Sequence, residues 1–165
     1  MGRFFSLVQI KNNGSREQFL KAFCDVMKKR SLVPCSEKES SVSYILAFSE
    51  SGKWVTLASK EYRDNPKQVK DDAKQTAAEM KTSSFSMDVV DSDWTYIELH
   101  TGADVHDTVM VGRSEFDEEH SPKGRRECWE PILAPGKTWE QISEIWNKNE
   151  VFVEDALYEA ASVLG

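Results

Sequence analysis

Three consecutive segments of the chain have the composition of β-strands, and short polar turns join them; in the first two, apolar and polar residues alternate with a period of two. They cover residues 84–91, 94–101 and 105–112. Because the side chains of a β-strand point alternately to opposite faces, this pattern is typical of strands that pair as antiparallel neighbours. It restricts the fold to one built around an antiparallel or mixed sheet.

Further strand-like and helix-like segments surround these three. Residues 3–10 predict a strand, and residues 42–49 and 53–59 predict a hairpin around Gly52. Residues 32–35 predict a short edge strand, because Pro34 cannot donate to a neighbouring strand. Apolar residues recur at helical spacing in four other segments, whose helices are expected to begin after Ser15, at Asn65-Pro66, after Thr138 and near Val153. Ser15 with Gln18 and Thr138 with Gln141 have the spacing of a capping box.

The expected fold is therefore α+β. Its mixed or antiparallel sheet has about six or seven strands, with two helices on one face and two more helices at the C-terminus. The order strand, helix, hairpin occurs from residue 3 and again from residue 53, which suggests a tandem repeat. No low-complexity linker divides residues 1–165, so a single domain is expected, with residues 113–165 as an appended helical cover.

Several features favour a cytoplasmic protein. No apolar segment approaches the ~20 residues that span a bilayer. The first residues lack the apolar core and cleavage site of a signal peptide. The three cysteines form no close pair, which fits a reducing compartment better than a disulfide framework.

The charge is negative and unevenly distributed. The net charge is −7, and residues 88–119 hold ten acidic residues against the single Arg113. A negative field repels phosphate backbones, so nucleic acid is not expected as a partner. It attracts a basic protein surface or a cation. The acidic residues taken as candidates for such binding are Asp104, Asp107, Glu115, Asp117 and Glu118.

The most informative strand is residues 94–101. Alternation places Thr95, Ile97 and Leu99 on one face, which we expect to be buried. The opposite face then carries Trp94, Tyr96, Glu98 and His100. Aromatic rings beside a carboxylate attract a cationic, partly apolar group, and Trp and Tyr are also enriched at protein-binding hot spots. A third interpretation is that the C-terminal helices cover this face.

Patterns for catalysis and cofactors are missing. We find no metal-ligand spacing, no glycine-rich phosphate loop and no serine-nucleophile motif, so no metal, cofactor or catalytic residue is expected. Cys128 follows Arg125 and Arg126, which could lower the pKa of its thiol. Cys24 is expected to be buried in a helix, and Trp139 and Trp146 to form one helical stripe in the core.

Three resemblances follow from these features. The doubled strand-helix-hairpin order, with Glu98 among aromatic residues, is similar to the gyrase-inhibitor-like small-molecule-binding fold. The small size, acidic charge and missing catalytic motifs resemble toxin-neutralising immunity proteins, and segments such as residues 44–48 and 54–57 resemble small bacterial cytosolic proteins of unassigned function.

The leading interpretation is a non-catalytic binding protein that recognises a basic protein surface, such as that of a toxin. The alternative is a pocket for a cationic or aromatic small molecule lined by Trp94, Tyr96 and Glu98.

Overall fold

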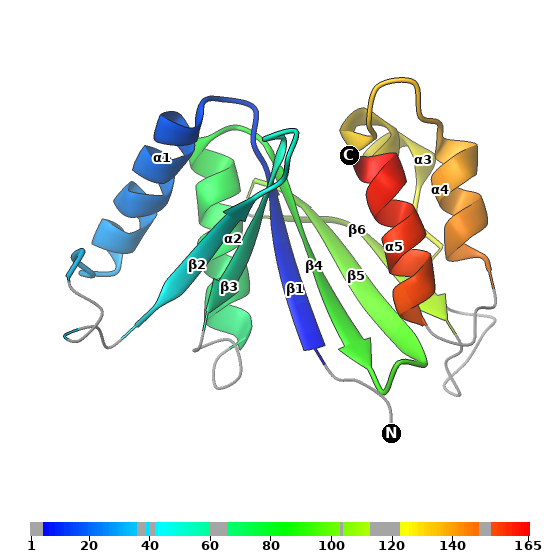
Figure 1. The fold of residues 1–165 in the computed structure, drawn as a ribbon, viewed down its shortest axis with the longest axis horizontal. Coiled ribbons are helices and arrows are strands. Elements are labelled where there is room, and N and C mark those ends of the chain that lie inside the picture. The colour runs from blue at the N-terminus through cyan, green and yellow to red at the C-terminus, as the bar shows by residue number, and fades with distance from the viewer. Residues whose placement is uncertain are drawn as a thin grey trace. The chain divides into compact units, whose positions relative to one another are not determined.

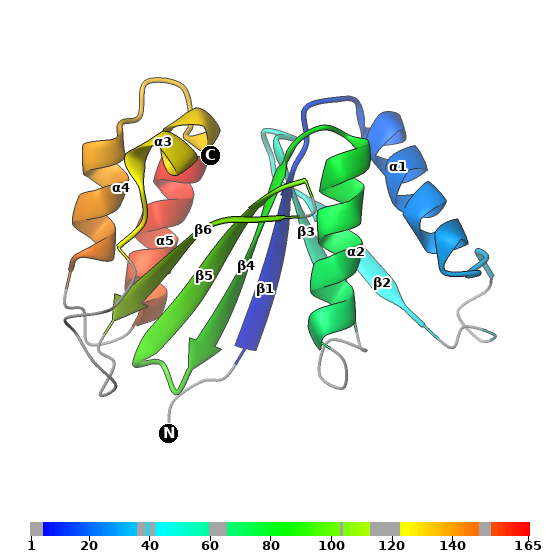
Figure 2. The same ribbon diagram turned by 180° about the vertical axis from the view of Figure 1, so that it is seen from behind.

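A computed structural model describes residues 5–35, 39, 42–59, 66–102, 104–112, 123–148 and 153–165. Over these residues the fold is α+β, as predicted, with one six-stranded antiparallel sheet in the order β2-β3-β1-β4-β5-β6 and five α-helices (Figures 1 and 2). The strands are β1 (Phe5–Lys11), β2 (Tyr44–Phe48), β3 (Trp54–Ser59), β4 (Ser83–Val90), β5 (Trp94–Thr101) and β6 (Asp104–Gly112). The helices are α1 (Arg16–Lys29), α2 (Pro66–Glu79), α3 (Arg126–Trp129), α4 (Trp139–Trp146) and α5 (Val153–Leu164), with a 3₁₀ turn, η2 (Glu130–Ile132), after α3.

The chain divides into two compact units. The N-terminal unit comprises Leu7–Phe85 and His100–Asp104, and the C-terminal unit comprises Met1–Ser6, Ser86–Leu99 and Val105–Gly165. The single domain expected for residues 1–165 stays a prediction, as does the tandem repeat.

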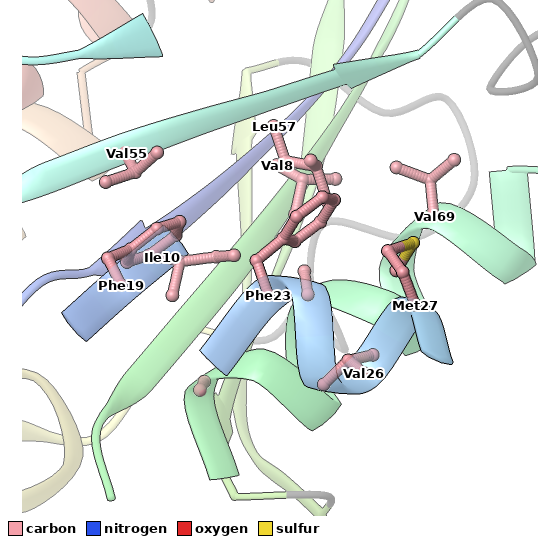
Figure 3. Packing of buried hydrophobic residues seen from close by; sticks show 11 residues of the cluster. Val8, Ile10, Phe19, Phe23, Val26, Met27, Val55, Leu57 and Val69 are labelled. Carbon is pink, nitrogen blue, oxygen red and sulfur yellow. The ribbon is translucent and has the colours of Figure 1, made fainter. Parts of the chain in front are cut away.

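The core of the N-terminal unit lies between α1, α2 and one face of its strands (Figure 3). The antiparallel register aligns Val8 with Leu57 and Ile10 with Val55, so these four side chains share a face. Each is at most 2% exposed. The helices contribute the apolar stripes that the sequence predicts, which are Phe19, Phe23, Val26 and Met27 from α1 and Val69, Ala73 and Ala77 from α2.

Local hydrogen bonds set both ends of α1. Ser15 and Gln18 form the predicted capping box. At the other end, Ser31 N–H donates to the carbonyl of Lys28 and Leu32 N–H to that of Met27, with Ser31 in the left-handed region at φ +61°. These two bonds form a Schellman motif. The strand predicted at residues 32–35 is therefore wrong, because the motif turns the chain and Leu32 packs against the core.

The predicted hairpin is confirmed as β2 and β3, which pair antiparallel with Leu46 opposite Leu57. Burial alternates along β2. Tyr44, Leu46 and Phe48 are partly buried, whereas Ile45 is 65% exposed.

The C-terminal unit contains a tryptophan cluster. The predicted capping box at Thr138 and Gln141 starts α4, which lies beside α5 (Figure 1). The Trp146 ring meets Trp129 edge-on at 4.5 Å and Trp139 at 5.8 Å between ring centroids. Trp139 and Trp146 thus lie on one helical stripe, as their spacing predicts; Trp146 is buried, whereas Trp139 is only partly buried. Before α4, residues 126–132 form the short helix α3 and the turn η2.

Candidate functional site: an acidic and aromatic strand face

The candidate site of the C-terminal unit begins with the alternation of side chains along β5. Thr95, Ile97 and Leu99 are at most 3% exposed, which confirms that this face is buried. On the other face, Trp94, Tyr96 and Glu98 are all partly exposed. The rings are therefore held by their surroundings and still reach solvent.

The neighbouring strand β4 adds a second carboxylate to this face. Ser86 Oγ donates to Glu98 Oε2 at 3.4 Å, a long contact that joins the two strands. Asp88 follows Ser86 by two residues on β4, so alternation places both side chains on the same face of that strand. Ser6 Oγ donates to Asp88 Oδ1 at 2.6 Å. We call Ser6, Ser86, Asp88, Trp94, Tyr96 and Glu98 the strand face.

Each carboxylate of the strand face accepts a hydrogen bond from a serine hydroxyl. A further hydrogen bond joins β4 to β5 at this point, because Thr95 Oγ1 donates to the backbone carbonyl of Asp88 at 3.0 Å. An ionised carboxylate has about four acceptor positions, so a serine donor is compatible with further hydrogen bonds. Chemically, the face offers two aromatic surfaces and two oriented anions, which suits a cationic group with an apolar or planar part.

Two other predicted site residues, His100 and Asp104, belong to the N-terminal unit. His100 is 1% exposed, so its imidazole lies in the interior and not at the surface. Asp104 is exposed. Neither residue is part of the strand face as defined above.

Asp107 occupies a different environment from the one expected. Its side chain is only 9% exposed. Asp107 Oδ2 accepts hydrogen bonds from the backbone N–H of Arg125 at 2.7 Å and from Trp129 Nε1 at 2.9 Å, and Oδ1 accepts from Arg125 Nε at 3.1 Å. The carboxylate therefore attaches the segment that begins α3 to β6. The remaining acidic candidates, Glu115, Asp117 and Glu118, lie outside the described residues.

The Cys128 thiol is not activated in the way its neighbouring arginines suggest. The pKa of the Cys128 thiol is raised, chiefly by burial and then by the negative charge of Asp107, and the opposing effect of Arg125 is smaller. Cys24 is partly buried and Cys35 is exposed, and all three thiols are free.

A polar cluster that sequence reasoning missed lies in the N-terminal unit. Asp72 is fully buried on α2 and accepts hydrogen bonds from Tyr44 Oη and Arg30 Nη1, each at 2.5 Å, and from Gln68 Nε2 at 3.1 Å. Burial and the bond to Asp72 raise the pKa of the Tyr44 hydroxyl. A signal was present, because Asp72 falls on the apolar stripe of the helix between Val69 and Thr76. A carboxylate at such a position needs a buried partner.

The expected absence of a metal site and of a membrane span can be compared with the described residues. No group of three or more His, Cys, Asp or Glu side chains among them is arranged to hold a metal ion. None of their helices has both the length and the apolar character needed to cross a membrane.

Comparison with known proteins identifies no similar protein. No family model, curated protein or solved structure matches it. The likeness to gyrase-inhibitor-like proteins and to immunity proteins therefore stays a prediction. The support for a function therefore comes from the strand face and its charges.

Proposed function

We propose that this chain is a non-catalytic binding protein that recognises a basic protein partner through the strand face. The observation that supports the proposal is the combination on one face of two partly exposed aromatic rings, Trp94 and Tyr96, with two carboxylates, Asp88 and Glu98. Neutralisation of a basic toxin is one form that this function would take.

The chain's charge distribution supports a basic partner. No Lys or Arg occurs between Lys81 and Arg113, a stretch that contains six acidic residues and all of β4, β5 and β6. The net charge of the whole chain is −7. A negative field of this kind accelerates encounter with a positive surface and disfavours acidic competitors.

The aromatic residues provide the short-range part of recognition. Tyr and Trp are enriched at hot spots because a large ring buries apolar area while few rotatable bonds lose freedom. Trp94 and Tyr96 are already partly buried, so less of that freedom remains to be lost on binding. Asp107 is excluded from the proposed contact surface, since Arg125 and Trp129 occupy its carboxylate.

The compartment that we propose for this function is the cytoplasm. All three cysteines are free thiols, which fits a reducing environment.

Affinity capture with purified, tagged chain tests the proposal. Native protein and the double variant Tyr96→Ala, Glu98→Gln are each incubated with lysate of the source cells, and the recovered proteins are identified and then purified. A matched control variant, Tyr158→Ala with Glu144→Gln, changes the same residue types at exposed positions on α5 and α4.

A basic partner should bind native and control protein equally. It should bind the strand-face variant at least about tenfold more weakly, the size of effect typical of a hot spot. Its association rate should also fall steeply as salt is added. A partner that is acidic, or that binds the strand-face variant as tightly as native protein, contradicts the proposal.

A further inference from the structure

We infer that the outer edge of β2 binds an extended segment of a partner protein, one that begins with an acidic residue and continues in uncharged, β-forming residues. This edge belongs to the N-terminal unit and is separate from the strand face. β2 ends the sheet, and no described residue pairs with its outer side. Its five residues include neither a charged residue nor a proline, which are the common means of preventing an edge strand from pairing with another chain.

The hydrogen-bond pattern of the hairpin identifies the main-chain groups that face this edge. Ser49 N–H donates to the carbonyl of Trp54 at 2.9 Å, so these two residues form a hydrogen-bonded pair. Such pairs alternate with non-hydrogen-bonded pairs along an antiparallel ladder, so Ala47 is bonded to β3 in turn. The N–H and C=O groups of Leu46 and Phe48 therefore point away from β3. They offer donors and acceptors at the spacing that an added strand requires.

Helix α1 provides apolar contact beyond β2 on one face of the sheet. It lies over β2, because the Phe19 and Phe48 rings meet edge-on at 5.5 Å between centroids. α2 packs on β3 and lies on one flank of α1, where Lys29 pairs with Glu79 (Figures 1 and 2). Leu20 precedes Lys29 by about two and a half helical turns, so it projects from the opposite flank, beyond β2. Its side chain is 37% exposed.

The other face of β2 is apolar as well. Ile45 is 65% exposed, and Ala47 is also exposed. Because side chains alternate along a strand, an added strand contacts Leu20 on one face and these two residues on the other. Uncharged residues of high β-propensity, such as valine and threonine, suit both faces.

Charge complementarity adds the acidic residue and distinguishes the partner from a second copy. The Arg16 guanidinium is exposed, lies 5.0 Å from the centroid of the Phe48 ring and forms no ion pair with a described residue. An acidic side chain beside Phe48 would pair with it. In an antiparallel arrangement, the more stable kind, that acid is at the N-terminal end of the segment. A second copy of β2 supplies none there, because only serine and valine occupy residues 40–43.

The test uses two capped seven-residue peptides in which threonine and valine alternate after a first residue, glutamate in one and glutamine in the other. Amide hydrogen exchange of the full chain is followed by NMR. With the glutamate peptide at ten times its dissociation constant, exchange at Leu46 and Phe48 should slow about tenfold, whereas exchange at Ala47 should change little. This peptide should bind about two- to fivefold more tightly than the glutamine peptide. Arg16→Gln should remove that difference, and the control Lys21→Gln, also an exposed cation of α1, should preserve it.

A substitution at the exposed face of the edge tests the apolar contact. Ile45→Glu should weaken binding of the glutamate peptide at least about threefold, and Tyr158→Glu, at an exposed position of α5, should leave it unchanged. Equal slowing at Leu46 and Ala47, or a glutamate preference that survives Arg16→Gln, overturns the inference. Protection of Leu46 that grows with protein concentration in the absence of peptide also overturns it, because a second copy then occupies the edge. These variants leave the strand face unchanged, so their results are independent of the proposed function.

Discussion

Replacing Asp107 tests whether this residue stabilises the C-terminal unit, as its burial indicates. Asp107→Ala removes the acceptor of three hydrogen bonds and leaves the indole N–H of Trp129, which is 0% exposed, without that partner. A hydrogen bond to a charged group contributes about 1.5–3 kcal/mol, and a buried donor left unsatisfied costs about 1–3 kcal/mol. The Arg125 guanidinium contributes little, because that side chain is 57% exposed and water replaces its bond.

We therefore expect Asp107→Ala to lower the free energy of unfolding by about 3–4 kcal/mol. Asp107→Asn keeps one oxygen acceptor for the backbone N–H of Arg125 and for Trp129, so its cost should be about 1–2 kcal/mol. Urea denaturation followed by circular dichroism at neutral pH measures both values.

A double-mutant cycle assigns the loss to the indole. In a Trp129→Phe background the donor is gone, so Asp107→Ala should cost about 1–2 kcal/mol less than in the native chain. If Asp107→Ala costs under about 1 kcal/mol, or if the cycle shows no coupling, the carboxylate does not stabilise this unit and becomes available again as a candidate for partner binding.

Four further substitutions have defined outcomes. The pKa of Tyr44 in the folded chain is raised above its usual value near 10, so the unfolded chain ionises first. The free energy of unfolding should therefore fall as the pH rises above about 10. Tyr44→Phe should flatten this pH dependence in alkaline denaturation curves. Ser31→Gly and Lys81→Gly relieve residues with φ of +61° and +52° at the ends of α1 and α2, and each should raise the melting temperature through a gain of up to about 1 kcal/mol; a loss would show that the side chain matters more than the backbone. Gly112→Ala should cost more than about 2 kcal/mol in urea denaturation, because its new Cβ would lie 2.2 Å from the carbonyl oxygen of Asp93; an unchanged midpoint would contradict this close approach.

Features encoded over a few residues could be predicted from the sequence. The capping boxes at Ser15 and Thr138 are complete within four residues, and both helices begin there. The alternation that separates Trp94 from Thr95 also needs only one strand, and the observed burial follows it. Neither signal depends on the rest of the fold.

Features that depend on distant partners could not be predicted. In the sequence, Asp107 does not differ from the other acidic residues of positions 88–119. Its hydrogen bonds to Arg125 and Trp129, 18 and 22 residues later, form only in the folded chain. The strand predicted at residues 32–35 was wrong for another reason. A Schellman ending normally has glycine in the left-handed position, and here that position holds Ser31.

The uneven placement of the indoles gives the chain an internal reporter. Four of the five tryptophans lie in the C-terminal unit, while Trp54 lies in the N-terminal unit, 5.1 Å from the Phe85 ring. Rings in edge contact, such as Trp129 and Trp146, produce strong near-ultraviolet dichroism only while their mutual orientation is fixed. Melting recorded where only tryptophan absorbs follows the C-terminal unit almost alone, and Trp54→Phe removes the remaining tryptophan signal of the N-terminal unit without added dyes or labels.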